Sequence, residues 1–199
     1  MDNRHKILLG GLALLLALLC SCTGDSSGSI SGTDSRAGAA STSPSQEEPP
    51  SEEESVAIFV TFTATDLWGN TVSQDVFSQS KLTMVNVWAT YCNPCLQEMP
   101  GLGELAAEYD AGEFQIIGIV SDVREGEDQG LVETLIQQTG ADYPHLLANN
   151  SIDDAFLAGV SGVPTTFFFD QEGMYLGGVV GSAEKSAWEE LINGLLEKM

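Results

Sequence analysis

Positive charge is scarce in this 199-residue sequence. Seven lysines and arginines face 29 aspartates and glutamates, which gives a formal net charge of −22. Nucleic acids and anionic lipid head groups bind basic surfaces, so neither is an expected partner. Solubility at a cell surface is a sufficient explanation for the acidic balance.

Long hydrophobic runs are also scarce, and the longest is too short to span a bilayer comfortably. Residues 7–19 form an apolar run of 13 residues, preceded by Arg4 and Lys6. A membrane-spanning helix needs about 20 apolar residues. A basic segment followed by a shorter apolar run is typical of an export signal.

The cysteine that closes this run is the expected lipid attachment site. Cys22 has Leu19 three residues before it and a small residue directly before it, whereas Cys20 fits this pattern less well. The segment resembles the lipobox of bacterial lipoproteins, in which the cysteine is diacylated and becomes the new N-terminus. Each buried methylene contributes about 0.8 kcal/mol, so two or three acyl chains would hold the protein at a membrane. The alternative is an ordinary secretory signal with bystander cysteines.

The composition divides the rest of the chain into two parts. Residues 23–55 are rich in Ser, Gly, Thr, Pro and Glu and have almost nothing to bury, so we expect a disordered tether with a reach of around 30 Å. Residues 56–199 alternate apolar runs with turn residues and are long enough for one globular domain, expected to be a monomer.

The apolar runs predict the secondary structure of this domain. Strand-helix-strand alternation gives parallel strands and a late hairpin adds antiparallel ones, so a mixed sheet is expected. The predicted elements are a hairpin (57–64 and 71–73), strands at 82–89, 114–120, 165–169 and 174–180, and helices at 92–109, 131–138, 152–158 and 186–198.

Only two cysteines remain in the domain, and they form a single CxxC. Zinc usually takes four cysteine or histidine ligands, so Cys92 and Cys95 outside the cytoplasm are typical of a redox pair. The predicted helix begins near Cys92, where unpaired N–H groups and the helix dipole stabilise the nucleophilic thiolate. Cys95 lies about one turn further in, so Cys92 should attack and Cys95 resolve. The alternatives are an inert structural disulfide or half of a metal site.

These residues resemble the thioredoxin superfamily and, within it, the membrane-tethered TlpA/ResA-type disulfide reductases. The matching segments are VNVWATYCNPC at 85–95, QEMP at 97–100 and GVPTTFFFD at 162–170. The resemblance implies a thioredoxin-like α/β fold, with a central mixed sheet flanked by helices and an extra helix and strand inserted within residues 121–160. It implies no metal and no cofactor beyond the redox-active Cys92–Cys95 disulfide.

The resemblance also implies a substrate groove. In that family a cis-proline faces the redox pair; by position it is Pro164, followed by Thr165, and the residue before it, Val163, pairs with the substrate chain. Trp88, partly in the core, and Tyr91 are expected to line the same groove. The alternative for Pro164 is a trans-proline turn.

Two positions bear on the acid-base chemistry. Minimal thioredoxins carry a buried aspartate six residues before the first cysteine, but here, as in TlpA/ResA-type proteins, Asn86 cannot titrate. Glu98 follows Cys95 by three residues, and in ResA-type proteins a glutamate at this position influences the active site; the alternative is a solvated helix glutamate. His145 is expected on the surface or in a loop.

The resulting hypothesis is a thiol-disulfide reductase anchored at the outer face of a bacterial cytoplasmic membrane, or in the periplasm. By resemblance, its substrate is an exported thiol protein such as apocytochrome c or a methionine sulfoxide reductase, and its electron donor is a transmembrane thiol carrier. The reverse activity, disulfide introduction, stays open because the residues between the cysteines, Asn93 and Pro94, are unusual and tune the potential. A thiol peroxidase would need Pro and Thr or Ser where Val85 and Ala89 stand, and a copper-delivery module would need CxxxC with a downstream histidine.

Overall fold

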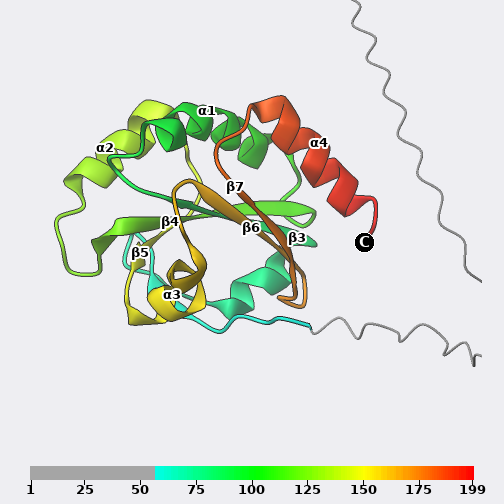
Figure 1. Cartoon of the computed structure of the whole chain (residues 1–199), viewed down its shortest axis with the longest axis horizontal. Helices are drawn as coiled ribbons and strands as arrows, with labels where there is room; N and C mark the ends of the chain where they lie inside the picture. Colours follow the sequence, from blue (N-terminus) through cyan, green and yellow to red (C-terminus); the bar gives the residue numbers. More distant parts are fainter. Residues whose placement is uncertain (1–56) are drawn as a thin grey trace, which may run out of the picture. The chain divides into compact units, whose positions relative to one another are not determined.

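A computed structural model describes residues 57–199 (Figure 1). The predicted export signal, the lipidation site Cys22 and the tether lie outside the described residues, so these expectations stay predictions. Within residues 57–199, no helix is both long enough and apolar enough to cross a membrane.

Short strands and helices alternate along the described chain. In order they are β1 (Thr63–Thr65), β2 (Thr71–Ser73), the 3-10 helix η1 (Gln74–Gln79), β3 (Leu82–Trp88), α1 (Asn93–Glu108), β4 (Phe114–Arg124), α2 (Gly130–Thr139), β5 (His145–Ala148), α3 (Asn150–Ala155), the 3-10 helix η2 (Leu157–Gly159), β6 (Thr165–Asp170), β7 (Tyr175–Val180) and α4 (Lys185–Leu196).

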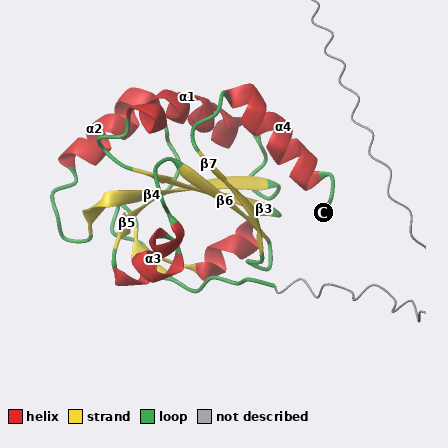
Figure 2. Cartoon of the chain, viewed as in Figure 1, coloured by secondary structure: helices red, strands yellow, loops and turns green. Residues whose placement is uncertain are grey.

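Five of the strands form a central sheet in the order β5-β4-β3-β6-β7. β3, β4 and β5 are parallel, whereas β6 is antiparallel to β3 and β7 is antiparallel to β6. Helices α1, α2 and α4 cover one face, and α3 lies with η1 on the other (Figures 1 and 2). This confirms the predicted mixed sheet flanked by helices, and the β1–β2 pair confirms the N-terminal hairpin.

The middle strand, β3, carries the active-site segment at its carboxyl end. All seven of its residues are buried because the sheet is covered on both faces. Alternate side chains of a strand point to opposite faces. Met84 and Trp88 accordingly pack in the core beneath α1, and Val85 and Val87 pack in the core on the other face. The segment that follows Trp88 therefore starts from a rigid support.

Two stretches differ from the expected elements. β4 extends four residues beyond the predicted end at residue 120, with a register shift before Arg124. The apolar pattern ends at Val120 because residues 121–124 of β4 lie at the end of the sheet. Side chains there are less completely covered and can be polar. The strand within residues 121–160 is β5, whose four residues are too few for periodicity to identify.

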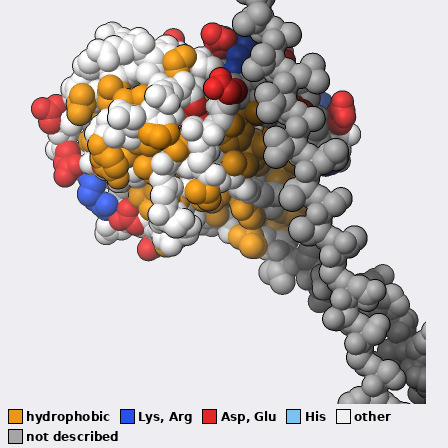
Figure 3. Space-filling model, turned by 45° about the horizontal axis from the view of Figure 1, so that its top comes forward, with side chains coloured by type: hydrophobic (Ala, Val, Ile, Leu, Met, Phe, Trp, Pro, Cys, Tyr) orange, Lys and Arg blue, Asp and Glu red, His pale blue; other side chains and the backbone are white. Residues whose placement is uncertain are grey.

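Acidic side chains far outnumber basic ones among the described residues. Residues 57–199 hold four lysines and arginines and 21 aspartates and glutamates. Figure 3 shows acidic side chains around the rim of one face and only isolated basic ones. Three of the four cations are also neutralised in ion pairs, which are Lys81–Glu113, Arg124–Asp153 and Lys185 with Glu104 and Glu108.

Candidate active site

Cys92 and Cys95 form a disulfide at the N-terminus of α1. Cys92 is the N-cap residue of the helix, and its backbone N–H donates to the Ala89 carbonyl at 3.0 Å. The S–S distance is 2.01 Å and the Cα atoms lie 5.3 Å apart. Pro94 stands in the first turn, where its missing N–H costs no helical hydrogen bond.

The two sulfurs differ in exposure and in their contacts with the helix N-terminus. The backbone N–H of Cys95 donates to Cys92 Sγ at 3.2 Å, so the Cys92 sulfur faces the unpaired donors of the helix N-terminus. Such donors stabilise a thiolate over a thiol. The exposed fraction is 5% for Cys92 and 0% for Cys95. Cys92 is thus the more exposed of the two cysteines, which is the arrangement that an attacking Cys92 and a resolving Cys95 would require.

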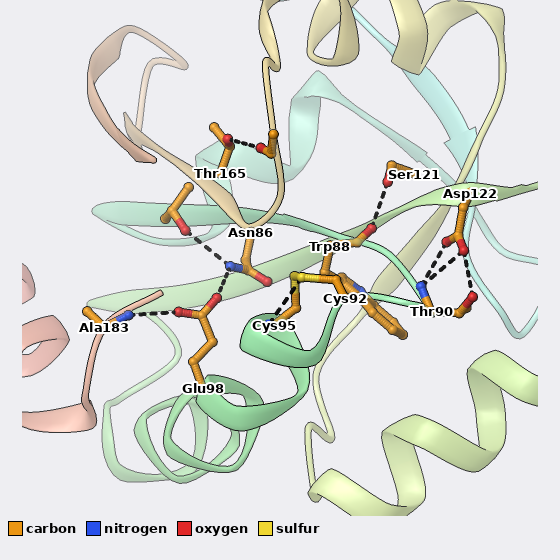
Figure 4. Close-up of a disulfide and its surroundings, with 12 residues drawn as sticks. Asn86, Trp88, Thr90, Cys92, Cys95, Glu98, Ser121, Asp122, Thr165 and Ala183 are labelled. Carbon is orange, nitrogen blue, oxygen red and sulfur yellow. Dashed lines mark hydrogen bonds between the residues drawn. A yellow bond between two sulfur atoms is a disulfide. The ribbon is translucent and has the colours of Figure 1, made fainter. Parts of the chain in front are cut away.

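The extension of β4 anchors the loop that carries Cys92. The Asp122 carboxylate accepts from the Thr90 backbone N–H at 3.0 and 3.1 Å and also from the Thr90 hydroxyl (Figure 4). The neighbouring Ser121 hydroxyl donates to the Trp88 carbonyl at 2.9 Å. Sequence reasoning missed this anchor, although the polar residues that directly follow the buried run 114–120 were a usable signal.

The predicted cis-proline lies beside the cysteines. The Val163–Pro164 peptide bond is cis. In the antiparallel pairing of β3 and β6, Thr165 lies opposite Val87, so Pro164 meets the carboxyl end of β3, where the cysteine loop begins. The Thr165 hydroxyl donates to the Gly162 carbonyl at 2.7 Å and is occupied within the loop. A substrate chain at this loop would meet the backbone and the half-buried Val163 side chain.

Glu98 is buried one turn after Cys95 and is not a solvated helix residue. Its Oε1 accepts from Asn86 Nδ2 at 3.1 Å, and its Oε2 accepts from the Ala183 N–H at 3.1 Å and Trp188 Nε1 at 3.3 Å. Burial raises the pKa of Glu98 above its ordinary value of 4.5, and the three hydrogen bonds lower it by a smaller amount. The carboxyl group therefore holds a proton to higher pH than an exposed glutamate.

Two aromatic residues expected in the groove have opposite environments. Tyr91 is 74% exposed next to Cys92, which leaves it free to contact a substrate. Trp88 is completely buried in the same core cluster as Cys92 and Cys95, so its expected place in the core is confirmed and its expected place in the groove wall is not. Its indole packs into the core instead, because alternation along β3 turns it beneath α1.

The expectation of a surface His145 is also wrong. His145 is fully buried at the start of β5. Its Nδ1 accepts from Trp88 Nε1 at 3.1 Å, and its Nε2 donates to the Ala141 carbonyl at 3.0 Å. An indole only donates and a carbonyl only accepts, so the ring is the neutral Nε2–H tautomer. The ring stacks on Tyr143, and a Cβ atom at Gly118 would overlap it, which explains the glycine there.

No metal cluster is present in the described part of the chain. Among residues 57–199, no group of three or more His, Cys, Asp or Glu side chains is arranged to hold a metal ion. The reactive group at this site is the disulfide itself.

A thioredoxin-like sheet with a helix-capping CxxC disulfide and a cis-proline loop beside it defines a thiol-disulfide oxidoreductase. Residues 57–174 match the AhpC/TSA family, and the chain belongs to that family. It is 29% identical over 140 residues to thiol-disulfide oxidoreductase ResA of Bacillus thuringiensis, covering 69% of this chain and 74% of the relative. It is also 29% identical over 125 residues to thiol:disulfide interchange protein DsbE of Pasteurella multocida, covering 63% and 65% of the two chains.

Solved structures show the same fold. A thiol:disulfide interchange protein of the thioredoxin family from Chlorobium tepidum superposes with a TM-score of 0.61 at 25% identity, covering 70% of this chain and 97% of the other. A second Chlorobium tepidum structure, described as a putative DsbE, gives a TM-score of 0.57 at 26% identity, covering 68% and 93%.

Proposed function

We propose that this oxidoreductase works as a reductase on disulfides of exported proteins at the outer face of the membrane. The difference between the two sulfurs carries the exchange chemistry of this proposal, and the resemblance to TlpA/ResA-type reductases carries its direction. Cys92 is the more exposed of the two cysteines and caps a helix N-terminus, and Cys95 is fully buried behind it. A sulfur beside the N–H groups of a helix N-terminus, with a sheltered second sulfur, suits rapid exchange with another protein.

The reaction proceeds by two thiol-disulfide exchanges. The Cys92 thiolate attacks one sulfur of the substrate disulfide, forming a mixed disulfide and releasing the other substrate sulfur as a thiol. Cys95 then attacks Cys92 Sγ, which restores the Cys92–Cys95 disulfide and releases the second substrate thiol. A dithiol donor, a transmembrane thiol carrier in this proposal, returns two electrons and two protons to the pair.

We infer the placement of the enzyme from the sequence and its partners from the resemblance to TlpA/ResA-type proteins. A lipid on Cys22 would hold the domain near the membrane, and the segment 23–55 would let it search for substrates there. Apocytochrome c and methionine sulfoxide reductase are the substrates that the resemblance favours. Peroxidase chemistry is disfavoured by the buried apolar Val85 and Ala89, which occupy the positions of its signature residues.

The reduction potential of the Cys92–Cys95 couple tests the direction of this reaction. The full chain would be equilibrated in thiol redox buffers, and the oxidised fraction of the peptide that holds both cysteines would be measured by mass spectrometry. We expect a value near or below about −230 mV, in the range of glutaredoxins and thioredoxin. A value near about −120 mV, typical of a strong oxidant, would reverse the proposed direction.

Glu98→Gln tests the acid-base role of the buried carboxyl. We expect the resolving step to slow by about tenfold or more, a modest share of what general acid-base groups contribute. Because burial raises the pKa of Glu98, the wild-type rate should show an inflection above pH 4.5 that the variant lacks. Stopped-flow measurement of mixed-disulfide decay across pH gives both quantities. Glu104→Gln, an exposed position on the same helix, is the matched control and should change neither.

A further inference from the structure

The Asn86 amide leaves one buried polar atom without a partner. Asn86 is fully buried in β3, and its Nδ2 donates to Glu98 Oε1 and to Thr166 Oγ1, each at 3.1 Å. Its Oδ1 makes no hydrogen bond. In Figure 4 this free oxygen is on the side of the amide that faces the Cys92–Cys95 disulfide.

The hydrogen bonds fix the orientation of the amide. When the Glu98 carboxylate is ionised, its Oε1 can only accept, so the amide nitrogen faces it; the reversed amide would place Oδ1 against the carboxylate oxygen. The free atom is therefore the acceptor. A buried acceptor without a partner costs about 1–3 kcal/mol, and such atoms in native structures require an explanation.

The explanation lies in the other redox state of the site. Cys95 and Glu98 lie one turn apart on α1, and Asn86 bonds to that same face of the helix. A disulfide sulfur carries no hydrogen, whereas a thiol is a donor. We propose that Asn86 Oδ1 accepts a hydrogen bond from the Cys95 thiol when the pair is reduced, so that one amide links the resolving cysteine to Glu98.

Reduction of the disulfide supplies the proton for the proposed hydrogen bond between Cys95 and Asn86. A donor dithiol becomes a disulfide, the Cys92–Cys95 bond breaks, and two electrons and two protons pass to the two sulfurs. The proton on Cys95 is the one that Asn86 Oδ1 binds. Because the bond stabilises the thiol over the thiolate, it raises the pKa of Cys95 and keeps it protonated while Cys92 attacks. This ordering rests on the proposed function.

Asn86→Leu gives the direct test, because the hypothesis and simple burial predict opposite signs. Loss of the acceptor should lower the pKa of Cys95 and speed its alkylation in the reduced full chain at pH 7 by about threefold to tenfold, the scale of one hydrogen bond. The leucine also makes the site more apolar, which by itself raises a thiol pKa and slows alkylation, so faster alkylation requires the lost hydrogen bond to be the larger effect. Mass spectrometry of the alkylated peptides separates Cys95 from the other cysteines.

A double variant removes the indirect effect through Glu98. Asn86 also donates to Glu98, whose charge acts on its surroundings. The Glu98 charge is the second cause, after burial, of the raised pKa of Tyr143, and Glu184 and Lys185 line the same pocket as Glu98. In a Glu98→Gln background, Asn86→Leu should still speed Cys95 alkylation. If Asn86→Leu does not speed Cys95 alkylation in that background, the proposal is overturned. An unchanged rate profile in Glu98→Gln alone would instead refute the acid-base role of Glu98 and leave the Asn86 result standing.

An infrared measurement tests the bond without any change at Asn86. The S–H stretching band of Cys95 is isolated as the difference between the reduced Cys92→Ser chain and the Cys92→Ser/Cys95→Ser chain. A hydrogen-bonded thiol absorbs at lower frequency than a free one, so a lowered band supports the bond. A band at the frequency of a free thiol overturns it even if Asn86→Leu fails to fold.

Discussion

Replacing Cys95 with serine is expected to trap the enzyme on its substrate, whereas replacing Cys92 with serine is expected to abolish the reaction. Cys92 holds the accessible sulfur, and a hydroxyl cannot attack a disulfide, so Cys92→Ser should lower the rate by roughly a thousandfold or more, as the loss of a nucleophile does. Cys95→Ser keeps the attacking thiol but removes the resolving one. A mixed disulfide through Cys92 should accumulate and run as a covalent adduct on a non-reducing gel.

The two variants control for each other. Both remove the Cys92–Cys95 disulfide and leave the core otherwise unchanged, so a stability effect would reduce both activities alike. The proposed attacking and resolving roles predict a covalent adduct with Cys95→Ser and none with Cys92→Ser, which a loss of stability would not. If Cys92→Ser formed the adduct and Cys95→Ser did not, the attacking and resolving roles would have to be exchanged.

Local rules predicted the start of the helix, whereas the resemblance predicted the cis-proline. Cys92 sits at the helix N-terminus because a buried strand ends just before it and a proline is placed in the first turn. Pro164 was expected beside the cysteines only because the segment 162–170 resembles the thioredoxin superfamily. Strand register brings it to the cysteine loop, since β6 pairs with β3.

The missed contacts join residues that are far apart along the chain. Glu98 is held by Ala183 and Trp188, which follow it by 85 and 90 residues. Neither a backbone N–H nor an indole at such separation has a periodic signature, so the sequence predicted the carboxyl group but not its environment. The burial of His145 was missed for a related reason: a polar residue in a four-residue strand carries no apolar pattern.

His145 is expected to make the stability of the protein strongly dependent on pH between 4 and 6.5. Burial lowers the pKa of His145 from 6.5 to about 4. Between these values the unfolded chain binds a proton that the folded protein does not, so stability is full above pH 6.5 and falls as pH drops. The difference of the two pKa values corresponds to about 3 kcal/mol. The physical cause is direct: a protonated ring would turn an N–H toward the Trp88 indole N–H, donor against donor.

His145→Asn separates this contribution from every other titrating group. Asparagine offers an oxygen near the position of Nδ1 and still accepts from Trp88, but it cannot be protonated. Urea unfolding of both proteins from pH 7 to pH 4 should show the stability advantage of the wild type shrinking by about 3 kcal/mol. Glu98, whose raised pKa acts with the opposite sign above pH 4.5, is present in both proteins and cancels in the difference. A difference that stays constant with pH would mean that the folded protein accepts the proton on His145 without losing its contacts.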